Sequence, residues 1–166
     1  MAIPVIDATV GGENSNSYLT VAEAEDIMDA NLYATSWDSA TADQKTVSLV
    51  MSTRILDEQI NWYGFIKDDD QALRWPRRNV KTLDGVWVDD DIIPKFIKDA
   101  TTELAKQLLA GDRTADSETM GYSRLKVDVL EIELDKYDRS DILPNSVYSI
   151  VQPYGDRVNS NTVERN

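Results

Sequence analysis

The chain has 166 residues, the size of one domain that can bury a sizeable core without disulfide or metal support. Its 30 acidic residues outnumber its 17 lysines and arginines and give a formal net charge of −13, so most of its surface would repel a nucleic-acid backbone or an anionic lipid. The chain contains no Cys and no His, which excludes disulfides, Ser–His–Asp and Cys–His catalysis, and thiolate or imidazole metal sites.

These exclusions favour a protein that is not an enzyme and needs no cofactor, although carboxylate chemistry stays open. The first residues, MAIPVIDATVGGENS, lack the basic and apolar regions of a secretory signal. The longest apolar run is far shorter than the roughly 20 residues that span a bilayer. We therefore expect a protein made in the cytoplasm, with no membrane partner.

The N-terminal part is predicted to be an extended arm followed by a helix. Residues 1–18 read as the arm, with a short strand around Ile3–Ile6 that ends at the glycine pair 11–12. A first helix is predicted from Thr20 to about Tyr33, because Thr20 and Glu23 have capping-box spacing. A loop is expected over residues 36–39.

A second helix is predicted from Thr41, which forms a capping box with Gln44, to about Ile60. It carries two apolar stripes on nearly opposite sides, and a helix that is apolar on two sides is buried on two sides. Both sides could pack inside the same domain, or one side could face a neighbouring subunit. One stripe contains Val47, Val50, Met51 and Ile55; the other, the candidate subunit interface, contains Leu49, Leu56 and Ile60.

The middle of the chain is irregular and holds its most basic stretch, Arg74-Trp75-Pro76-Arg77-Arg78. Arginine beside tryptophan could stack bases and hold phosphate. Alternatively, Trp75 fills the core while the arginines pair with the many acids, and the net charge favours this second interpretation. The motif residues Trp75, Pro76 and Arg77 are therefore predicted to be structural. Asp84–Gly85 is the signal of a two-residue hairpin.

Two aspartate triplets, 68–70 and 89–91, are the obvious candidates for binding Ca²⁺ or Mg²⁺. Consecutive side chains point in diverging directions, and the spacing of a Ca²⁺-binding loop is absent from both runs. We expect solvated acidic loops and no metal.

The remaining elements follow from periodicity and proline positions. A third helix is predicted from Pro94 to Gly111, with one apolar stripe that faces the core. The alternation from Leu125 to Leu134 changes phase and predicts a bulge or two short strands. A short fourth helix is expected after Pro144, ended by Pro153. The stripe of the third helix contains Ile93, Ile97, Ala100, Thr101, Leu104 and Leu108.

Together these patterns predict an α+β, mainly helical fold. It has three main helices, a short C-terminal helix, a small β hairpin and short strands. We expect residues 1–154 to form a single domain and residues 155–166 to form a polar tail that cannot bury enough surface to fold alone.

Four segments resemble a family known in phage genomes as DnaT-like single-stranded-DNA-binding proteins, which corresponds to the head–tail connector adaptor. They are NSYLTVAEAEDIM (16–28), ALRWPRRNV (72–80), IPKFIKDATTELAKQLLAGD (93–112) and LPNSVYSIVQPY (143–154). They occur in the family's order over nearly the whole chain. The acidic middle with its two Asp triplets departs from the family's pattern.

This resemblance implies a structural virion protein in the phage neck. Such an adaptor forms a dodecameric homo-oligomeric ring on the portal and links the capsid to a downstream neck or tail protein, while genomic DNA passes through its lumen without specific binding. An acidic ring suits a conduit, because each neutralised phosphate would retard the DNA. The alternative function is single-stranded-DNA binding, and a metal-dependent carboxylate enzyme is a third.

The C-terminal segment is a candidate for docking on the portal or on a neighbouring adaptor, because a polar, unpatterned segment can order on a partner by backbone pairing. We expect the free protein to be a monomer until it meets the portal. A chain end with no role is the other interpretation. The candidate docking residues are Tyr154, Arg157, Val158, Val163 and Arg165.

Overall fold

The computed structural model describes residues 2–115, 124–127, 130–133 and 141–158, and confirms a mainly helical α+β fold. The helices are α1 (Val21–Met28), α2 (Thr35–Asp38), α3 (Ala42–Gln59), α4 (Lys95–Ala110) and α5 (Asn145–Val151), and α5 continues into a 3₁₀ turn, η1 (Gln152–Tyr154). The strands are β1 (Ile60–Trp62), β2 (Phe65–Ile66), β3 (Arg77–Arg78), β4 (Arg124–Val127), β5 (Leu130–Glu133) and β6 (Gly155–Arg157). Three antiparallel pairs form, β1–β6, β2–β3 and β4–β5.

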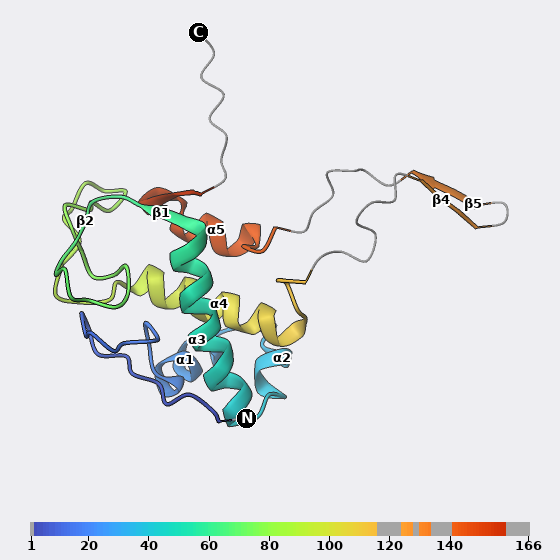
Figure 1. Cartoon of the computed structure of the whole chain (residues 1–166), viewed down its shortest axis with the longest axis horizontal. Coiled ribbons are helices and arrows are strands. Elements are labelled where there is room, and N and C mark those ends of the chain that lie inside the picture. The colour runs from blue at the N-terminus through green and yellow to red at the C-terminus, as the bar shows by residue number, and fades with distance from the viewer. Residues whose placement is uncertain (1, 116–123, 128–129, 134–140, 159–166) are drawn as a thin grey trace, which may run out of the picture.

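Helix α4 is the centre of the fold, because it packs against α1, α2, α3 and α5. Figure 1 shows α3 running across α4, from the end of the molecule that holds α1 and α2 to the end that holds β1 and β2. The predicted apolar stripe of α4 is confirmed, since Ile97 and Leu104 are fully buried. The buried hydroxyl of Thr101 donates to the carbonyl oxygen of Ile97 at 2.7 Å, so this polar group is satisfied inside its own helix.

Helix α3 is buried on two sides within one chain, and this corrects the candidate subunit interface. Leu49 and Leu56 are 0% exposed and Ile60 is 3% exposed. One side of the helix packs on α4, while the segment before α1 covers another side and places Tyr18 against Thr53. The subunit-interface prediction is therefore wrong for these three residues, and packing inside the domain is right.

The N-terminal arm is not extended, and residues 2–18 contain no strand. The Asp7 carbonyl oxygen accepts the backbone N–H of Asn16 at 2.9 Å, and the Asn16 side chain accepts the N–H of Asp7 at 2.9 Å. This closes a loop whose turn contains Gly11 at φ 68°, a conformation that favours glycine. The arm folds back because Asn16 satisfies the backbone groups that a strand would have offered to a partner strand.

Helix boundaries agree with the sequence where side chains cap the helix. The predicted capping boxes of Thr20 and Thr41 both form, and α4 starts after Pro94 and ends at Ala110, directly before Gly111. The first helix ends at Met28 instead of near Tyr33. The expected loop at 36–39 contains the short helix α2, because Trp37 is drawn into the core.

The hairpins differ in detail from the predictions. The Thr82 N–H donates to the Val86 carbonyl oxygen at 2.8 Å, so the loop between them has three residues rather than two. Gly85 at φ 78° supplies the left-handed residue of such a loop. Strands β4 and β5 confirm the prediction of two short strands, with Val127 opposite Leu130. Leu134 lies outside the described residues.

The expected boundary of the polar tail is wrong, because residues 155–157 form β6 and pair with β1. Gly155 lies opposite Trp62, and an added Cβ atom would lie 2.6 Å from Ile60 Cγ2 and 2.8 Å from the carbonyl oxygen of Asn61. The chain can therefore approach β1 this closely only with glycine at this position.

The part of the chain that the structure describes contains no helix long and apolar enough to cross a membrane.

We predict that Leu104→Ala lowers the free energy of unfolding by about 2–5 kcal/mol, because Leu104 is fully buried in α4. Urea denaturation followed by circular dichroism measures this change. Leu83→Ala is the matched control, since Leu83 is exposed and its removal should change stability by less than about 0.5 kcal/mol. Equal effects of the two substitutions would contradict the placement of α4.

We predict that Gly155→Ala destabilises the protein by about 1–3 kcal/mol, because its Cβ would overlap β1. Gly111→Ala is the control, as a Cβ there meets no atom within 4 Å. Thermal unfolding of both variants gives the comparison. A wild-type melting temperature for Gly155→Ala would mean that β6 does not pair with β1.

Candidate functional site

The basic motif is built into the core around Trp75, which is 1% exposed. The Trp75 ring makes edge-to-face contacts with Trp62 at 5.7 Å and with Phe96 at 5.4 Å, and Phe96 stacks on Tyr154 at 3.7 Å. This aromatic column connects the motif to β1, α4 and η1. The prediction that Trp75 fills the core is confirmed, so its faces are not available to a base.

The guanidinium group of Arg77 binds backbone carbonyl groups instead of the acids that we expected. It donates to the carbonyl oxygens of Tyr63 at 2.7 Å, Gly64 at 2.8 Å, Arg74 at 3.1 Å and Trp62 at 3.3 Å. A planar group with five N–H donors suits this task, because it can donate to several carbonyl oxygens at once. Burial lowers the pKa of Arg77 from its ordinary value. Arg77 is thus a structural clamp.

Pro76 supports the same segment. It is buried and follows a cis peptide bond from Trp75. Its carbonyl oxygen accepts the backbone N–H of Lys67 at 3.3 Å and the side-chain amide of Gln71 at 3.2 Å. The three motif residues therefore lie together, and each one holds the loop that follows β1.

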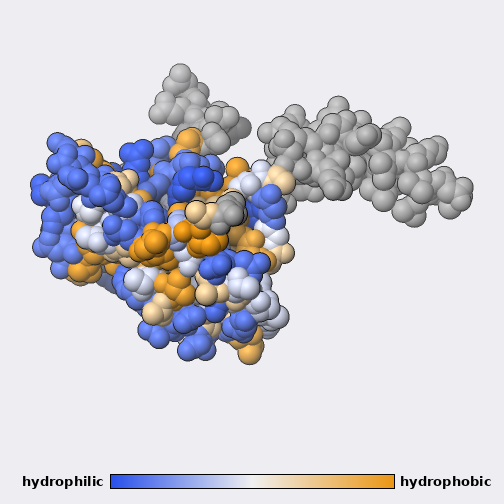
Figure 2. All heavy atoms as spheres, turned by 60° about the horizontal axis from the view of Figure 1, so that its bottom comes forward, coloured by the Kyte–Doolittle hydropathy of each residue, from blue (hydrophilic) through white to orange (hydrophobic). Residues whose placement is uncertain are grey.

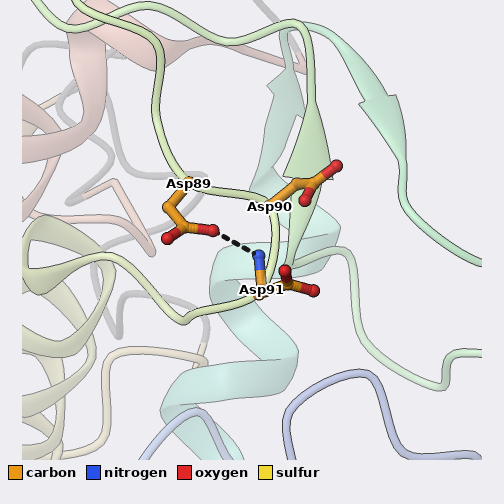
Figure 3. A group of neighbouring side chains, drawn as sticks. All are labelled: Asp89, Asp90 and Asp91. Atoms are coloured by element: carbon orange, nitrogen blue, oxygen red, sulfur yellow. Dashed lines mark hydrogen bonds between the residues drawn. The ribbon is translucent and has the colours of Figure 1, made fainter.

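The second aspartate triplet brings three carboxylates together. One oxygen of each of Asp89, Asp90 and Asp91 lies within 4.8 Å of the others. Figure 3 shows these side chains leaving consecutive positions in different directions, with the Asp89 carboxylate accepting the backbone N–H of Asp91 at 2.8 Å. The carboxylate of Asp89 therefore has a hydrogen-bond donor within its own loop.

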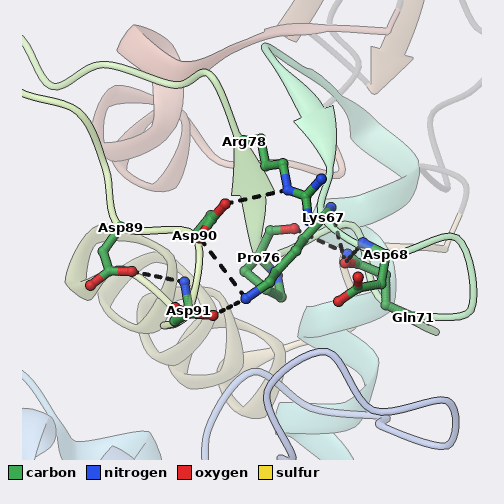
Figure 4. A network of polar contacts seen from close by, with 8 residues as sticks. All are labelled: Lys67, Asp68, Gln71, Pro76, Arg78, Asp89, Asp90 and Asp91. Carbon is green, nitrogen blue, oxygen red and sulfur yellow. Dashed lines mark hydrogen bonds and ion pairs between the residues drawn. The ribbon is translucent and has the colours of Figure 1, made fainter.

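The remaining two carboxylates are neutralised by the protein itself (Figure 4). Lys67 forms an ion pair with Asp91 and lies 3.9 Å from Asp90, and Arg78 contacts Asp90 at 3.3 Å. This network joins the loop of Lys67 to the loop of the triplet across β3. Arg78 thus follows the prediction that arginines pair with acids, and the triplet is an ion-pair network rather than an open cation site.

The first triplet, 68–70, is exposed, as expected for a solvated loop. Its backbone is held by Gln71, whose side-chain oxygen accepts the N–H of Asp68 at 3.1 Å.

A cleft of about 700 Å³ lies beside the motif, between the C-terminal half of α3, β1 and residues 72–74. Apolar side chains of Val50, Leu73 and Val158 line it, together with Arg54 and Arg74. Sequence reasoning did not find this cleft, because its walls come from segments far apart in the chain.

Asp57 is a partly buried acid in the wall of this cleft. Burial raises its pKa to about 6, although it accepts hydrogen bonds from the Tyr18 hydroxyl and, at 3.1 Å, from the backbone N–H of Arg74, which lower the pKa. Burial also raises the pKa of Tyr18 well above its ordinary value. Asp57 therefore ties α3 to the N-terminal segment and to the motif. It lies seven residues after Val50 and so on the same side of the helix as this apolar residue, which was the signal in the sequence.

Several large apolar side chains of β2 and of residues 83–92 are exposed; these residues, here called the apolar loop surface, are Phe65, Leu83, Val86, Trp87 and Ile92. All five residues are exposed, with Phe65 at 68% and Trp87 at 61%. The Lys81 ammonium lies 4.4 Å from the centre of the Trp87 ring, a cation–π contact. Exposed aromatic rings next to a cation are the groups that could stack bases, and the sequence analysis missed them.

Three of the five candidate docking residues belong to the described part of the chain, and two of these three make contacts within the fold. Tyr154 is buried in the aromatic column. Arg157 stacks over the Tyr148 ring at 4.4 Å and pairs with Asp141. These two residues therefore serve the fold, whereas Val158 is exposed beside the cleft. Val163 and Arg165 lie outside the described residues and stay predictions.

We predict that Asp57→Asn removes a pH dependence of stability. The rise of the Asp57 pKa from 3.8 to about 6 corresponds to about 3 kcal/mol of stabilisation of the folded state by the protonated carboxyl group. This stabilisation is present below about pH 4 and is lost as the pH rises through about 6, because the carboxyl group then ionises. Relative to the variant, the wild type should therefore gain about 3 kcal/mol between neutral and acidic pH. Urea denaturation at both pH values measures it.

The control for this experiment is Asp29→Asn, which changes an exposed acid at the end of α1. A difference between wild type and Asp57→Asn that does not vary with pH would contradict the burial of this carboxyl.

Comparison with known proteins gives one match. A family model described as "Putative DnaT-like ssDNA binding protein" matches residues 1–165. Searches of curated proteins and of solved structures returned no match. Because the family model covers almost the whole chain, the protein belongs to the DnaT-like single-stranded-DNA-binding protein family.

Proposed function

We propose that this family member is a structural adaptor of the phage head–tail connector, rather than an enzyme. It would form a ring in the virion neck, between the portal and the next neck or tail protein. The proposal rests on the observation that the basic motif, residues 74–78, has a structural role in the fold. Trp75 and Arg77 are only 1% and 8% exposed, and Arg78 is paired with Asp90, so the residues best suited to hold nucleic acid serve the fold.

The charge of the chain supports the same function. At −13, its surface repels phosphate, and DNA binding depends on neutralising phosphates. A protein that encloses moving DNA benefits from this repulsion. The four segments that resemble the connector adaptors also contribute buried residues to the described core, with Tyr18, Trp75, Ile97 and Val147 as examples. The resemblance therefore concerns residues that determine the fold.

Single-stranded-DNA binding is the second candidate, and the description of the family favours it directly. None of the comparisons names a connector. The apolar loop surface offers exposed Phe65 and Trp87, with Lys81 against the Trp87 ring. Stacking of a base on an aromatic side chain contributes about 1–3 kcal/mol, so two such rings could hold a short strand.

Two binding measurements separate the functions. The first is fluorescence anisotropy of a labelled single-stranded oligonucleotide at low and at physiological salt. The second is co-sedimentation with purified portal rings. We expect portal binding and no salt-sensitive oligonucleotide binding. Tight oligonucleotide binding that weakens steeply with salt, and is lost in Phe65→Ala/Trp87→Ala while the melting temperature is unchanged, would establish the second function instead.

The chain end can be tested in the same portal assay. Deletion of residues 159–166 leaves β6 intact, so the melting temperature should not change. If these residues dock on the portal, the deletion weakens co-sedimentation, and a scrambled sequence of the same residues behaves like the deletion. Wild-type portal binding by the truncated protein would show that the end has no docking role.

A further inference from the structure

Strands β4 and β5 form a two-stranded ribbon, here called the β4–β5 ribbon, with one apolar face and one charged face. In their antiparallel register Leu125 lies opposite Ile132, and Val127 lies opposite Leu130. Directly opposite residues of two antiparallel strands share a face, and so do alternate residues of one strand. These four aliphatic residues therefore lie on one face of the ribbon, with no charged residue among them.

The other face of the ribbon holds complementary charges. Arg124 lies opposite Glu133, and Lys126 lies opposite Glu131. Opposite charges at directly opposed positions stabilise the pairing of two strands. The four charged residues of the two strands cancel, so the ribbon is electrically neutral in a chain whose net charge is −13.

The apolar face of the ribbon has no extensive packing against the helices of the described chain. Helix α4 packs against α1, α2, α3 and α5, whereas β4 packs mainly against β5. Figure 1 shows the ribbon apart from the helices. A lone two-stranded ribbon is at best marginally stable in water, and a third strand or a packing surface is needed to stabilise it. The apolar face is therefore suited to contact another molecule.

The surface of the helical part of the chain is less uniform. Figure 2 shows that apolar groups on one of its faces lie between hydrophilic ones. The apolar loop surface is also mixed, since the Lys81 ammonium lies over the Trp87 ring. A face made of aliphatic residues alone distinguishes the β4–β5 ribbon from both, and such a face is typical of a contact between proteins.

The chemistry of the ribbon selects a protein as its partner. A nucleic acid needs basic residues for its phosphates or rings for its bases, and the two strands have no net charge and no aromatic residue. An anionic lipid surface needs the same basic residues. Two identical ribbons that met through their apolar faces would form a symmetric contact, which stops at a dimer.

We infer that the apolar face of the β4–β5 ribbon docks on an apolar surface of the portal protein. The ribbon suits this task, because a neutral element can approach a partner without the repulsion that the acidic helical part would meet from acids on that partner. The inference rests on the proposed connector role for the identity of the partner. It assigns the docking contact to a part of the chain other than the C-terminal end.

The test is co-sedimentation of full-length variants with purified portal rings. The apolar variant is Val127→Thr/Leu130→Thr, which changes one opposed pair on the apolar face. The matched control is Lys126→Thr/Glu131→Thr, which changes the neighbouring opposed pair on the charged face and leaves the net charge unchanged. Threonine has a high strand propensity, so both variants keep the ribbon. Thermal unfolding of each variant checks the helical part.

Wild type and control should bind the portal alike, and the apolar variant should bind about tenfold more weakly or less. All three should have the same melting temperature, because the helices do not depend on the ribbon. Portal binding by the apolar variant at wild-type strength, or an equal loss in both variants, would overturn the inference. A lower melting temperature of the apolar variant alone would also overturn it, since the face would then pack on its own chain.

Sedimentation velocity without portal tests the remaining occupant. A wild-type dimer that is lost in the apolar variant alone would assign the face to a second copy of this chain and overturn the inference. Failure of the connector role looks different, because wild type itself would then not bind the portal. Equal portal binding by wild type and the apolar variant would refute the ribbon contact and leave the connector role standing.

Discussion

The fold depends on the anchoring of Trp75 and Arg77 to the chain around β1. Trp75 gives this segment its apolar contacts, and the Arg77 guanidinium donates hydrogen bonds to four of the backbone carbonyl groups around it. Unsatisfied buried carbonyls would cost more than the hydrogen bonds themselves contribute. With this segment fixed, β1 is held for pairing with β6, and Phe96 and Tyr154 complete the column.

The same anchoring creates the cleft. Residues 72–74 form one wall, since Trp75 directly after them is buried in the core and Arg74 donates its backbone N–H to Asp57 of α3. A buried carboxylate is costly when ionised, and its pKa of about 6 reflects that cost. Asp57 therefore joins α3 to Tyr18 and Arg74 by hydrogen bonds, but its ionised form adds little to the free energy of unfolding at neutral pH.

The distribution of charge matters as much as its sum. Two acids of the second triplet are neutralised by Lys67 and Arg78. The first 44 residues hold acids without any lysine or arginine, and two of these acids, Glu23 and Glu25, pair with Lys98 and Lys45. Such a chain has a strongly acidic part and a cleft in which arginines outnumber acids. The phosphates of a nucleic acid need a continuous basic track, and this distribution of charge is a poor match for that need.

The sequence by itself determined the elements whose signals are local. Capping boxes at Thr20 and Thr41 and the proline and glycine that bound α4 located helix starts and ends, because caps are made by nearby residues. The apolar stripe of α4 identified its core face for the same reason. The composition also favoured a structural place for Trp75, since so acidic a chain is a poor match for phosphate.

Only the tertiary structure decided which surfaces meet. The stripe of Leu49, Leu56 and Ile60 is equally apolar whether a subunit or the same domain covers it, so the sequence could not choose. The close approach of Gly155 to β1, the four carbonyls around Arg77, and the placement of Asp57 between Tyr18 and Arg74 join residues far apart in the chain. Such contacts arise when the chain folds back on itself, and periodicity within one segment carries no record of them.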